Sequence, residues 1–116
     1  MTFLNLVVLR AKDVARLGQF YEALGLSFVR ERHGSGPEHL AATAGGMTLE
    51  IYPWAQGRGT EGLRIGFQVD DVEMRLAAAL AQGATLVTAF KDGPWGPRAV
   101  VTDPEGHIVE LAGAAS

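Results

Sequence analysis

The sequence contains no cysteine. It therefore has no disulfide, no thiolate nucleophile and no zinc site of the cysteine type. Lysine and arginine form no cluster that would suit nucleic acid, and the net charge of −3 is too small to indicate an acidic tail. No apolar run reaches membrane-spanning length, and the first residues lack the pattern of a signal peptide. We therefore expect a cytoplasmic protein with neither a nucleic-acid nor a membrane partner.

Several catalytic patterns are also missing. The glycine clusters match turns, and none of them fits a phosphate-binding loop. The three histidines cannot be combined with a serine and an aspartate into a triad from their spacing alone. What remains is a chain of 116 residues that is 47% hydrophobic, which is enough for one compact domain or two fused half-domains.

The chain repeats itself once. Residues 6–14 and 64–72 are both strand-like apolar runs that end in Asp-Val. Gly25 follows Val14 by eleven residues, and Gly83 follows Val72 by the same interval, so the register holds through the segment between them. Two copies of one structural unit are therefore expected.

In both copies the segment before the glycine has helical periodicity. Asp13 is the expected N-cap of the first helix, and Asp70 with Glu73 is expected to form a capping box at the second. Gly25 and Gly83 lie where a left-handed residue ends a helix. The apolar stripes comprise Val14, Leu17, Phe20, Tyr21 and Leu24 in the first helix, and Val72, Leu76, Ala79 and Leu80 in the second.

Three strand-like runs follow each helix, at 27–33, 38–44 and 47–53 and then at 85–91, 98–103 and 107–112. The turn at 103–106, Asp-Pro-Glu-Gly, matches type I. These patterns predict an α+β fold of tandem β-α-β-β-β modules at 1–54 and 63–116, joined by a glycine-rich linker at 55–62. The modules should build a curved mixed sheet that forms a cup, with the helices outside.

Strand residues alternate between two faces, and one face must pack on the helices. That apolar set comprises Val7, Leu9, Leu49, Ile51, Ile65, Phe67, Val69, Val109 and Leu111. The cup face then holds Leu6, Val8, Arg10, Thr48, Glu50, Tyr52, Arg64, Gly66, Gln68, Ile108 and Glu110. Glu50 and Glu110 occupy equivalent positions of the repeat. Because an unpaired buried charge is costly, either this face is wet or the two carboxylates have partners.

The chain resembles the vicinal-oxygen-chelate superfamily of glyoxalases, bleomycin-resistance proteins and dioxygenases. The resemblance covers essentially the whole chain and is carried by the motifs at 7–14, 20–21, 24–26, 66–72, 94–96 and 103–111. Metal-dependent members take one ligand from each of four strands, commonly His or Gln, Glu, His and Glu. Those positions here are Leu6, Glu50, Arg64 and Glu110. Leucine has no lone pair to donate and arginine is a permanent cation, so we expect no metal at these positions and no cofactor.

Arg64 could instead place its guanidinium between Glu50 and Glu110, either as a structural plug or in contact with a ligand. His39 is the one histidine that could reach a ligand, whereas His33 is expected to be solvated and His107 to be exposed. Two tryptophans near loop tips could stack on a flat molecule. The candidate ligand-binding residues are Arg10, Glu50, Tyr52, Trp54, Arg64, Gln68, Trp95 and Glu110.

The resemblance implies a binding protein of the bleomycin-resistance type, with a role in antibiotic resistance, that holds a flat or hydrophobic small molecule in its cup. We also expect a homodimer, because exposed sheet edges and a partly apolar concave face invite a second copy. One alternative is a lyase-, isomerase- or dioxygenase-like enzyme with a displaced metal site, or with acid–base chemistry at Glu50 or Glu110. Another is a structural or regulatory fold without a ligand.

Overall fold

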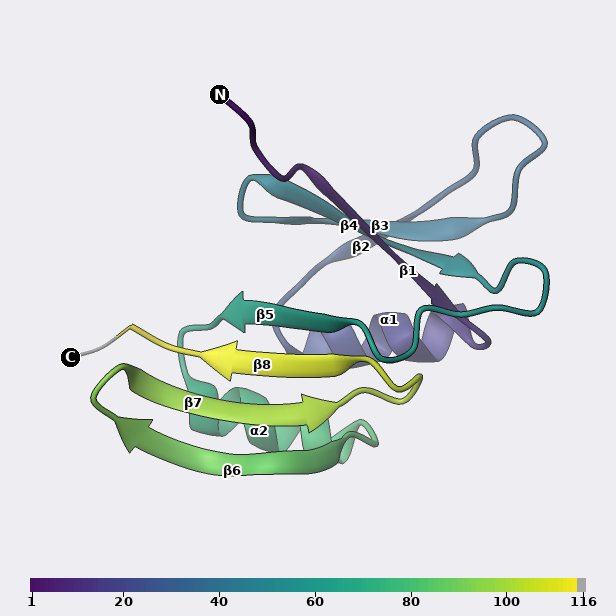
Figure 1. The fold of residues 1–116 in the computed structure, drawn as a ribbon. Coiled ribbons are helices and arrows are strands. Elements are labelled where there is room, and N and C mark those ends of the chain that lie inside the picture. Colours follow the sequence, from purple (N-terminus) through teal and green to yellow (C-terminus); the bar gives the residue numbers. More distant parts are fainter. Residues whose placement is uncertain (115–116) are drawn as a thin grey trace.

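A computed structural model describes residues 1–114, so the last two residues of the predicted second module, 115 and 116, lie outside the described residues. The chain forms two helices and eight strands (Figure 1). In chain order these are β1 (Leu6–Ala11), α1 (Val14–Ala23), β2 (Phe28–Glu31), β3 (His39–Ala44), β4 (Met47–Pro53), β5 (Arg64–Gln68), α2 (Val72–Ala81), β6 (Thr85–Gly93), β7 (Gly96–Thr102) and β8 (Ile108–Ala112).

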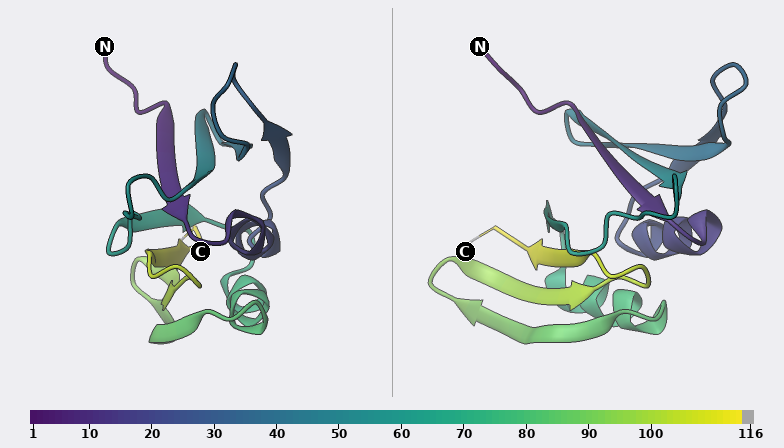
Figure 2. Two further views of the ribbon diagram at one scale, coloured as in Figure 1. Left: turned by 90° about the vertical axis from the view of Figure 1, so that its right-hand side faces the viewer. Right: turned by 45° about the vertical axis from the view of Figure 1, so that its right-hand side comes forward.

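The two halves of the chain have the same strand topology, as the sequence repeat predicts. One four-stranded sheet has the order β1-β4-β3-β2 and the other has the order β5-β8-β7-β6. In each sheet the first pair is parallel and the remaining pairs are antiparallel. The α+β class is therefore confirmed. In the described residues the strands divide into two mixed sheets set at a steep angle, and α1 and α2 lie side by side (Figure 2).

The predicted alternation of the strands is confirmed by burial. Leu9 and Ile51 of the first sheet and Val109 and Leu111 of the second are fully buried, and they join the helix residues Leu17, Phe20, Tyr21 and Ala79 in one core cluster. Each of the buried valine, leucine, isoleucine and phenylalanine side chains contributes roughly 1.5–3 kcal/mol when it leaves water. The opposite faces of both sheets keep the polar residues.

Several boundaries differ from the sequence prediction. β2 ends at Glu31, two residues before the predicted end of that strand, and β7 begins at Gly96 rather than at Arg98. Leu80, which was assigned to the apolar stripe of the second helix, is 38% exposed. It lies one residue before the end of α2.

Both helices begin after an aspartate at the same position of the repeat, and the predicted capping box does not mark the start of the second helix. Asp13 caps α1, since its Oδ1 accepts from the backbone N–H of Arg16 at 3.0 Å. Asp71 caps α2 in the same way, accepting from the N–H of Met74 at 3.1 Å. The assignment of Asp70 as the second cap was therefore wrong, because the residue in extended backbone directly before Val72 is Asp71. Gly25 and Gly83 have the positive φ predicted for them.

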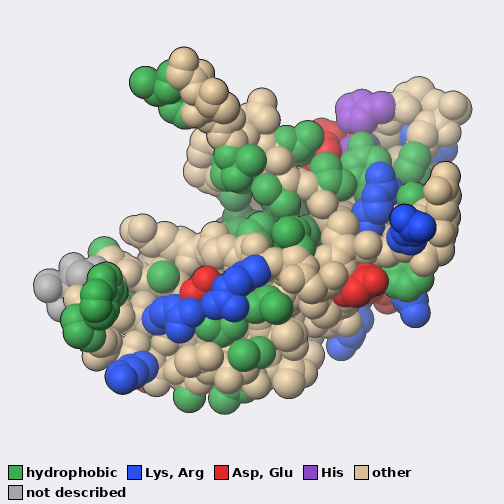
Figure 3. Space-filling view, in the orientation of Figure 1, with side chains coloured by type: hydrophobic (Ala, Val, Ile, Leu, Met, Phe, Trp, Pro, Cys, Tyr) green, Lys and Arg blue, Asp and Glu red, His purple; other side chains and the backbone are tan. Residues whose placement is uncertain are grey.

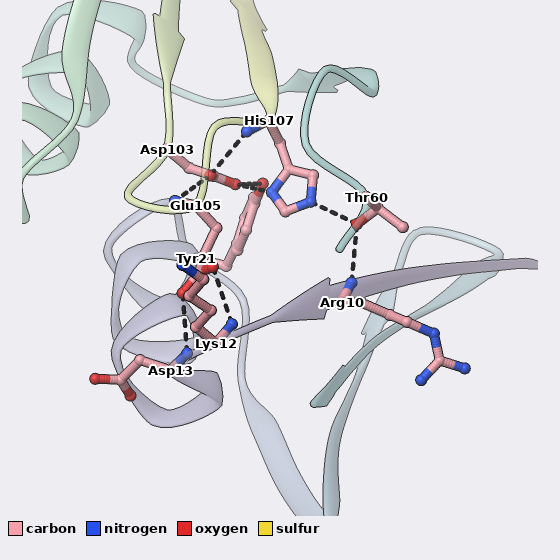
Figure 4. A network of polar contacts seen from close by, with 8 residues as sticks. All are labelled: Arg10, Lys12, Asp13, Tyr21, Thr60, Asp103, Glu105 and His107. Atoms are coloured by element: carbon pink, nitrogen blue, oxygen red, sulfur yellow. Dashed lines mark hydrogen bonds and ion pairs between the residues drawn. The ribbon is translucent and has the colours of Figure 1, made fainter. Parts of the chain in front are cut away.

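A buried hydrogen-bond network joins the two modules (Figure 4). Tyr21 in α1 donates its hydroxyl to Oδ2 of Asp103 at 2.6 Å, and Nδ1 of His107 lies 2.8 Å from the same oxygen. Nε2 of His107 lies 2.6 Å from the Thr60 hydroxyl oxygen, which accepts the N–H of Arg10 at 2.9 Å. An ionised carboxylate can only accept, so Nδ1 carries the imidazole proton, and Thr60 donates to Nε2 in the neutral ring. Both ring nitrogens of His107 and the Thr60 hydroxyl thus have hydrogen-bond partners in this network.

His107 was predicted to be exposed, and that prediction was wrong: the residue is fully buried. Its side chain does point away from the cup face, but that direction leads into the packed layer where Tyr21 of the other module lies. The same turn carries Glu105, whose two carboxylate oxygens accept the backbone N–H groups of Lys12 and Asp13, each at 2.9 Å. The 103–107 turn therefore fixes the start of α1.

The network shifts the pKa values of two of its members, Asp103 and Tyr21, in opposite directions. Burial acts to raise the pKa of Asp103, but hydrogen bonds from His107 and Tyr21 outweigh it and keep that pKa below its ordinary value. Burial, together with the neighbouring Asp103 carboxylate, raises the pKa of Tyr21 well above the ordinary phenol value. The junction is therefore built around an ionised aspartate and a neutral tyrosine.

Candidate functional site

One row of side chains crosses all four strands of the first sheet on the face opposite the helices. Arg10 pairs in register with Tyr52, and Glu31 pairs with His39. The His39 and Tyr52 rings stack with centroids 4.0 Å apart and planes 10° apart, and the Arg10 guanidinium lies 5.3 Å from the centre of the Tyr52 ring. Two of the predicted ligand-binding residues, Arg10 and Tyr52, therefore sit next to each other and beside the candidate His39.

Glu50 lies on the same face, and its Oε2 is 3.7 Å from Nε2 of His39. Oε1 of Glu31 is 3.3 Å from the same nitrogen. His39 is only 1% exposed, whereas His33, two residues after the end of β2, is exposed as predicted. Sequence reasoning missed Glu31 because no signal in the chain reveals which residue of β2 pairs with β3.

The second sheet carries a different cluster. Glu110 receives the Nε–H of Arg64 at 3.0 Å on one carboxylate oxygen and the Nε–H of Arg98 at 2.9 Å on the other. Hydrogen bonds from these two guanidinium groups hold the pKa of the Glu110 carboxyl below its usual range. Arg98 was missed by the sequence analysis, although its place on β7, next to β8, would allow the contact once the pairing is known.

Arg64 does not bridge Glu50 and Glu110 within the described chain. It contacts Glu110 only, while Glu50 lies on the other sheet beside His39. The two glutamates occupy equivalent positions of the repeat, yet each pairs with side chains of its own sheet: Glu50 with His39, and Glu110 with Arg64 and Arg98. Gln68, at the end of β5, is exposed.

The four positions that hold a metal in relatives do not fit a metal here. Leu6 offers no lone pair, and the guanidinium of Arg64 already occupies one oxygen of Glu110. A cation in this set would meet a fixed positive charge instead of a ligand.

A cleft of about 750 Å³ lies between the two modules. It is visible in Figure 3 as a notch with hydrophobic side chains on its inner wall. Arg64, Gln68, Asp70 and Arg75 supply its charged and polar groups. Its apolar side chains include Val7, Leu26, Met47, Leu49, Ile65, Phe67 and Val69. Five of these, Val7, Leu49, Ile65, Phe67 and Val69, belong to the strand faces predicted to pack on the helices, so the cleft does not coincide with the predicted cup face.

The two tryptophans lie outside the cleft lining. Trp95, in the turn between β6 and β7, is 89% exposed. Trp54 follows β4, and its ring lies under the Lys12 ammonium at 4.6 Å. The indole N–H of Trp54 is buried without a hydrogen-bond partner among the described residues. Within one chain, neither tryptophan therefore shares a surface with Arg64.

None of the described helices is both long and apolar enough to cross a bilayer.

A family model described as the glyoxalase-like domain matches residues 6–112. An uncharacterized protein of Mycobacterium tuberculosis, Rv0887c, is 46% identical over 50 residues, a segment that covers 42% of this chain and 29% of that protein. An uncharacterized protein of Mycobacterium bovis matches at the same identity over 33% of its length. The matched segment thus spans about a third of these relatives.

Solved structures share the fold over nearly the whole chain. A glyoxalase/bleomycin resistance protein/dioxygenase family enzyme from Burkholderia phytofirmans has a TM-score of 0.77 at 23% identity, covering 97% of this chain and 99% of that one. TnmS3, an antibiotic binding protein from a Streptomyces species, has a TM-score of 0.76 at 23% identity, covering 98% and 97%. At these identities the similarity establishes the fold alone.

Proposed function

Because the chain belongs to the glyoxalase-like domain family, within the vicinal-oxygen-chelate superfamily, we propose that it is a small-molecule binding protein. On this proposal it needs no divalent ion at the four positions that hold one in metal-dependent relatives. The cleft between the modules carries the proposal. A hollow of about 750 Å³ is the size of a site for a drug-sized ligand, and its mostly apolar lining suits a flat or hydrophobic molecule.

The charged and polar residues of the cleft indicate which polar groups the ligand has. Arg64 is half exposed and uses only its Nε–H for Glu110, so its terminal nitrogens can donate to a ligand. Gln68 offers both a donor and an acceptor on the same strand. A ligand with an aromatic body and one anionic or carbonyl group matches this pair. The antibiotic-binding relative TnmS3 is consistent with a ligand of this class.

We propose further that the protein works as a homodimer. Arg10, Glu50 and Tyr52 lie on the first sheet and Arg64, Gln68 and Glu110 on the second, and no contact joins the two groups in the described chain. A second copy could bring the first group of one chain against the second group of the other. Exposed apolar side chains such as Leu6, Val29 and Val87 support such a contact.

The enzyme alternative based on acid–base chemistry at Glu110 has less support. A general acid or base works best when its pKa lies near the operating pH. The two arginines instead lower the pKa of Glu110, which makes it a weak base and a poor proton donor near neutrality.

A fluorescent probe tests the binding proposal. The dye 8-anilino-1-naphthalenesulfonate is flat, apolar and anionic, and we expect its emission to rise and saturate with the folded protein. Ala44→Trp should fill part of the cleft lining and weaken the dye by about tenfold or more, which corresponds to about 1.4 kcal/mol. Ala89→Trp is the matched control, because Ala89 is exposed on β6 and does not line the cleft.

If the wild type and a folded Ala44→Trp variant bind the dye with equal affinity, the dye binds outside the cleft, and the proposal that the cleft is the ligand site is contradicted. If the dye does bind there, flat aromatic antibiotics that displace it are the next ligands to measure. Sedimentation at tens of micromolar tests the dimer separately, and a monomer at all concentrations would contradict it.

A further inference from the structure

Four metal-ligating side chains meet at one end of the first sheet, away from the cleft. Glu31, His33, His39 and Glu50 each place one ligand atom within 4.8 Å of the ligand atoms of the other three. We call them the His–Glu cluster. Histidine and acidic side chains are visible together over this end of the molecule at the upper right of Figure 3. The cluster is built from β2, β3 and β4 and from His33 in the segment after β2, and it shares only Glu50 with the usual family positions.

His39 is held in one orientation by contacts that leave Nε2 unused. Its Nδ1 lies 3.3 Å from the carbonyl oxygen of Pro37, and its ring stacks on Tyr52. A carbonyl can only accept, so the contact places a proton on Nδ1 and leaves a lone pair on Nε2 in the neutral ring. Metal-binding histidines are commonly oriented in this way, with the second ring nitrogen donating to a carbonyl.

Nε2 of His39 is buried and has no hydrogen-bond partner among the described residues. It faces Oε1 of Glu31 at 3.3 Å and Oε2 of Glu50 at 3.7 Å. A lone pair and two carboxylates repel one another unless a cation lies between them. An unpartnered buried nitrogen of this kind calls for an explanation.

Nearby arginines do not supply that cation in the described chain. Arg30 and Arg32 both pair with Glu38, at 3.4 and 3.9 Å. Arg10 lies over the Tyr52 ring and donates to the carbonyl oxygen of Pro53 at 3.1 Å. The ion pairs of Glu31 and Glu50 are formed with the imidazoles alone.

We propose that the His–Glu cluster binds one divalent transition-metal ion of the zinc, cobalt or nickel type. Two imidazoles and two carboxylates suit these ions, and no cysteine is needed. Ligand bonds of about 2.0–2.1 Å in a tetrahedral site put neighbouring ligand atoms about 3.3–3.4 Å apart. Nε2 of His39 and Oε1 of Glu31 are already at that separation, and Glu50 needs only a small approach.

His33 completes the set from the solvent-exposed side. Its Nε2 lies 3.6 Å from Oε1 of Glu31, and its side chain is largely exposed. Gly34, which follows it, has φ of +58°, so the chain turns there without a side chain in the way. The rigid part of the site is therefore His39 between two carboxylates, and His33 closes it from solvent. The site does not depend on the cleft between the modules.

Titration of the metal-free protein with cobalt tests the site. The full chain is stripped with a chelator and dialysed, and Co²⁺ is added while the visible absorption is followed; Zn²⁺ is then added to displace the cobalt. We expect one cobalt per chain with an absorption band typical of low coordination number, and loss of that band on zinc addition.

Three variants locate the ion. Glu31→Gln and Glu50→Gln keep side-chain size and are each expected to weaken cobalt binding by roughly 100-fold or more, a larger loss than is usual for residues outside the ligand shell. His33→Ala should weaken it by about tenfold, since the exposed ligand can be replaced by water. Glu38→Gln is the matched control: it removes a carboxylate from the same region that is outside the cluster.

Circular dichroism confirms that each variant is folded, and the two glutamine variants avoid any change to the buried His39. The proposal is overturned if the wild type binds no cobalt. It is also overturned if Glu38→Gln lowers the affinity as much as Glu50→Gln does. A cluster neutralised only by protons would give the first of these results.

Discussion

The hydroxyl of Tyr21 donates a hydrogen bond of 2.6 Å to Asp103, which lies 82 residues further along the chain. The two residues come from different modules, Tyr21 from α1 and Asp103 from the turn between β7 and β8. Asp103 also accepts the backbone N–H groups of Glu105 and His107 on its other oxygen. A single carboxylate thus ties the second module's turn to the first module's helix.

Loss of the Tyr21 hydroxyl should destabilise the fold. Tyr21→Phe removes a hydrogen bond to a buried charged acceptor, and we expect the free energy of unfolding in urea to fall by about 1.5–3 kcal/mol. Tyr52→Phe is the control, because the Tyr52 ring stacks on His39 but its hydroxyl makes no hydrogen bond in the described chain. Similar losses in both variants would contradict a special role for the Tyr21 hydroxyl.

Acid should weaken the junction in a defined pH range. The pKa of Asp103 is lowered in the folded state, so its contribution to stability is fully present above the ordinary value of 3.8 and is lost as the pH falls through the lower folded value. The free energy of unfolding should therefore fall steeply below about pH 4. Asp103→Asn should be less stable at pH 7 and should show a flatter acid limb. If the free energy of unfolding of Asp103→Asn falls with acid as steeply as that of the wild type, Asp103 is not the source of the acid sensitivity.

The Thr60 hydroxyl should connect the segment between the modules to β1. Thr60→Val keeps the shape but leaves the Arg10 N–H without its acceptor and Nε2 of His107 without its donor. We expect a loss of about 2 kcal/mol in thermal or urea unfolding. Thr43→Val, at an exposed position of β3, should stay within about 0.5 kcal/mol of the wild type. If Thr60→Val does the same, the network does not stabilise the junction.

The Arg64–Glu110–Arg98 cluster should matter little for stability. The two arginine side chains are 50% and 46% exposed, and exposed ion pairs are worth about 0.2–1 kcal/mol. Arg64→Leu should therefore change the free energy of unfolding by less than about 1 kcal/mol. High salt should reduce the effect further. A loss of several kcal/mol would indicate that Arg64 is buried in solution, as it would be against a second copy.

The sequence alone determined the repeat, both helices and the face of each strand that packs on them. These features are local: a period of two or 3.6 residues, a capping aspartate and a glycine at a helix end are all written within about twenty residues. The lack of a metal-ligating side chain at Leu6 and at Arg64 was equally readable once the resemblance to the superfamily had indicated the four positions, because the chemistry of a side chain does not depend on packing.

Only the tertiary structure decided which side chains meet. Alternation showed that His107 points away from the cup face, but not that Tyr21 and Thr60 from distant segments enclose it there. The pairing of β2 with β3 brings Glu31 beside His39, and the pairing of β7 with β8 brings Arg98 to Glu110. A strand's own sequence fixes the face of each side chain, whereas its neighbours depend on register between strands and on how the modules dock. Those contacts between distant segments create both clusters and the cleft.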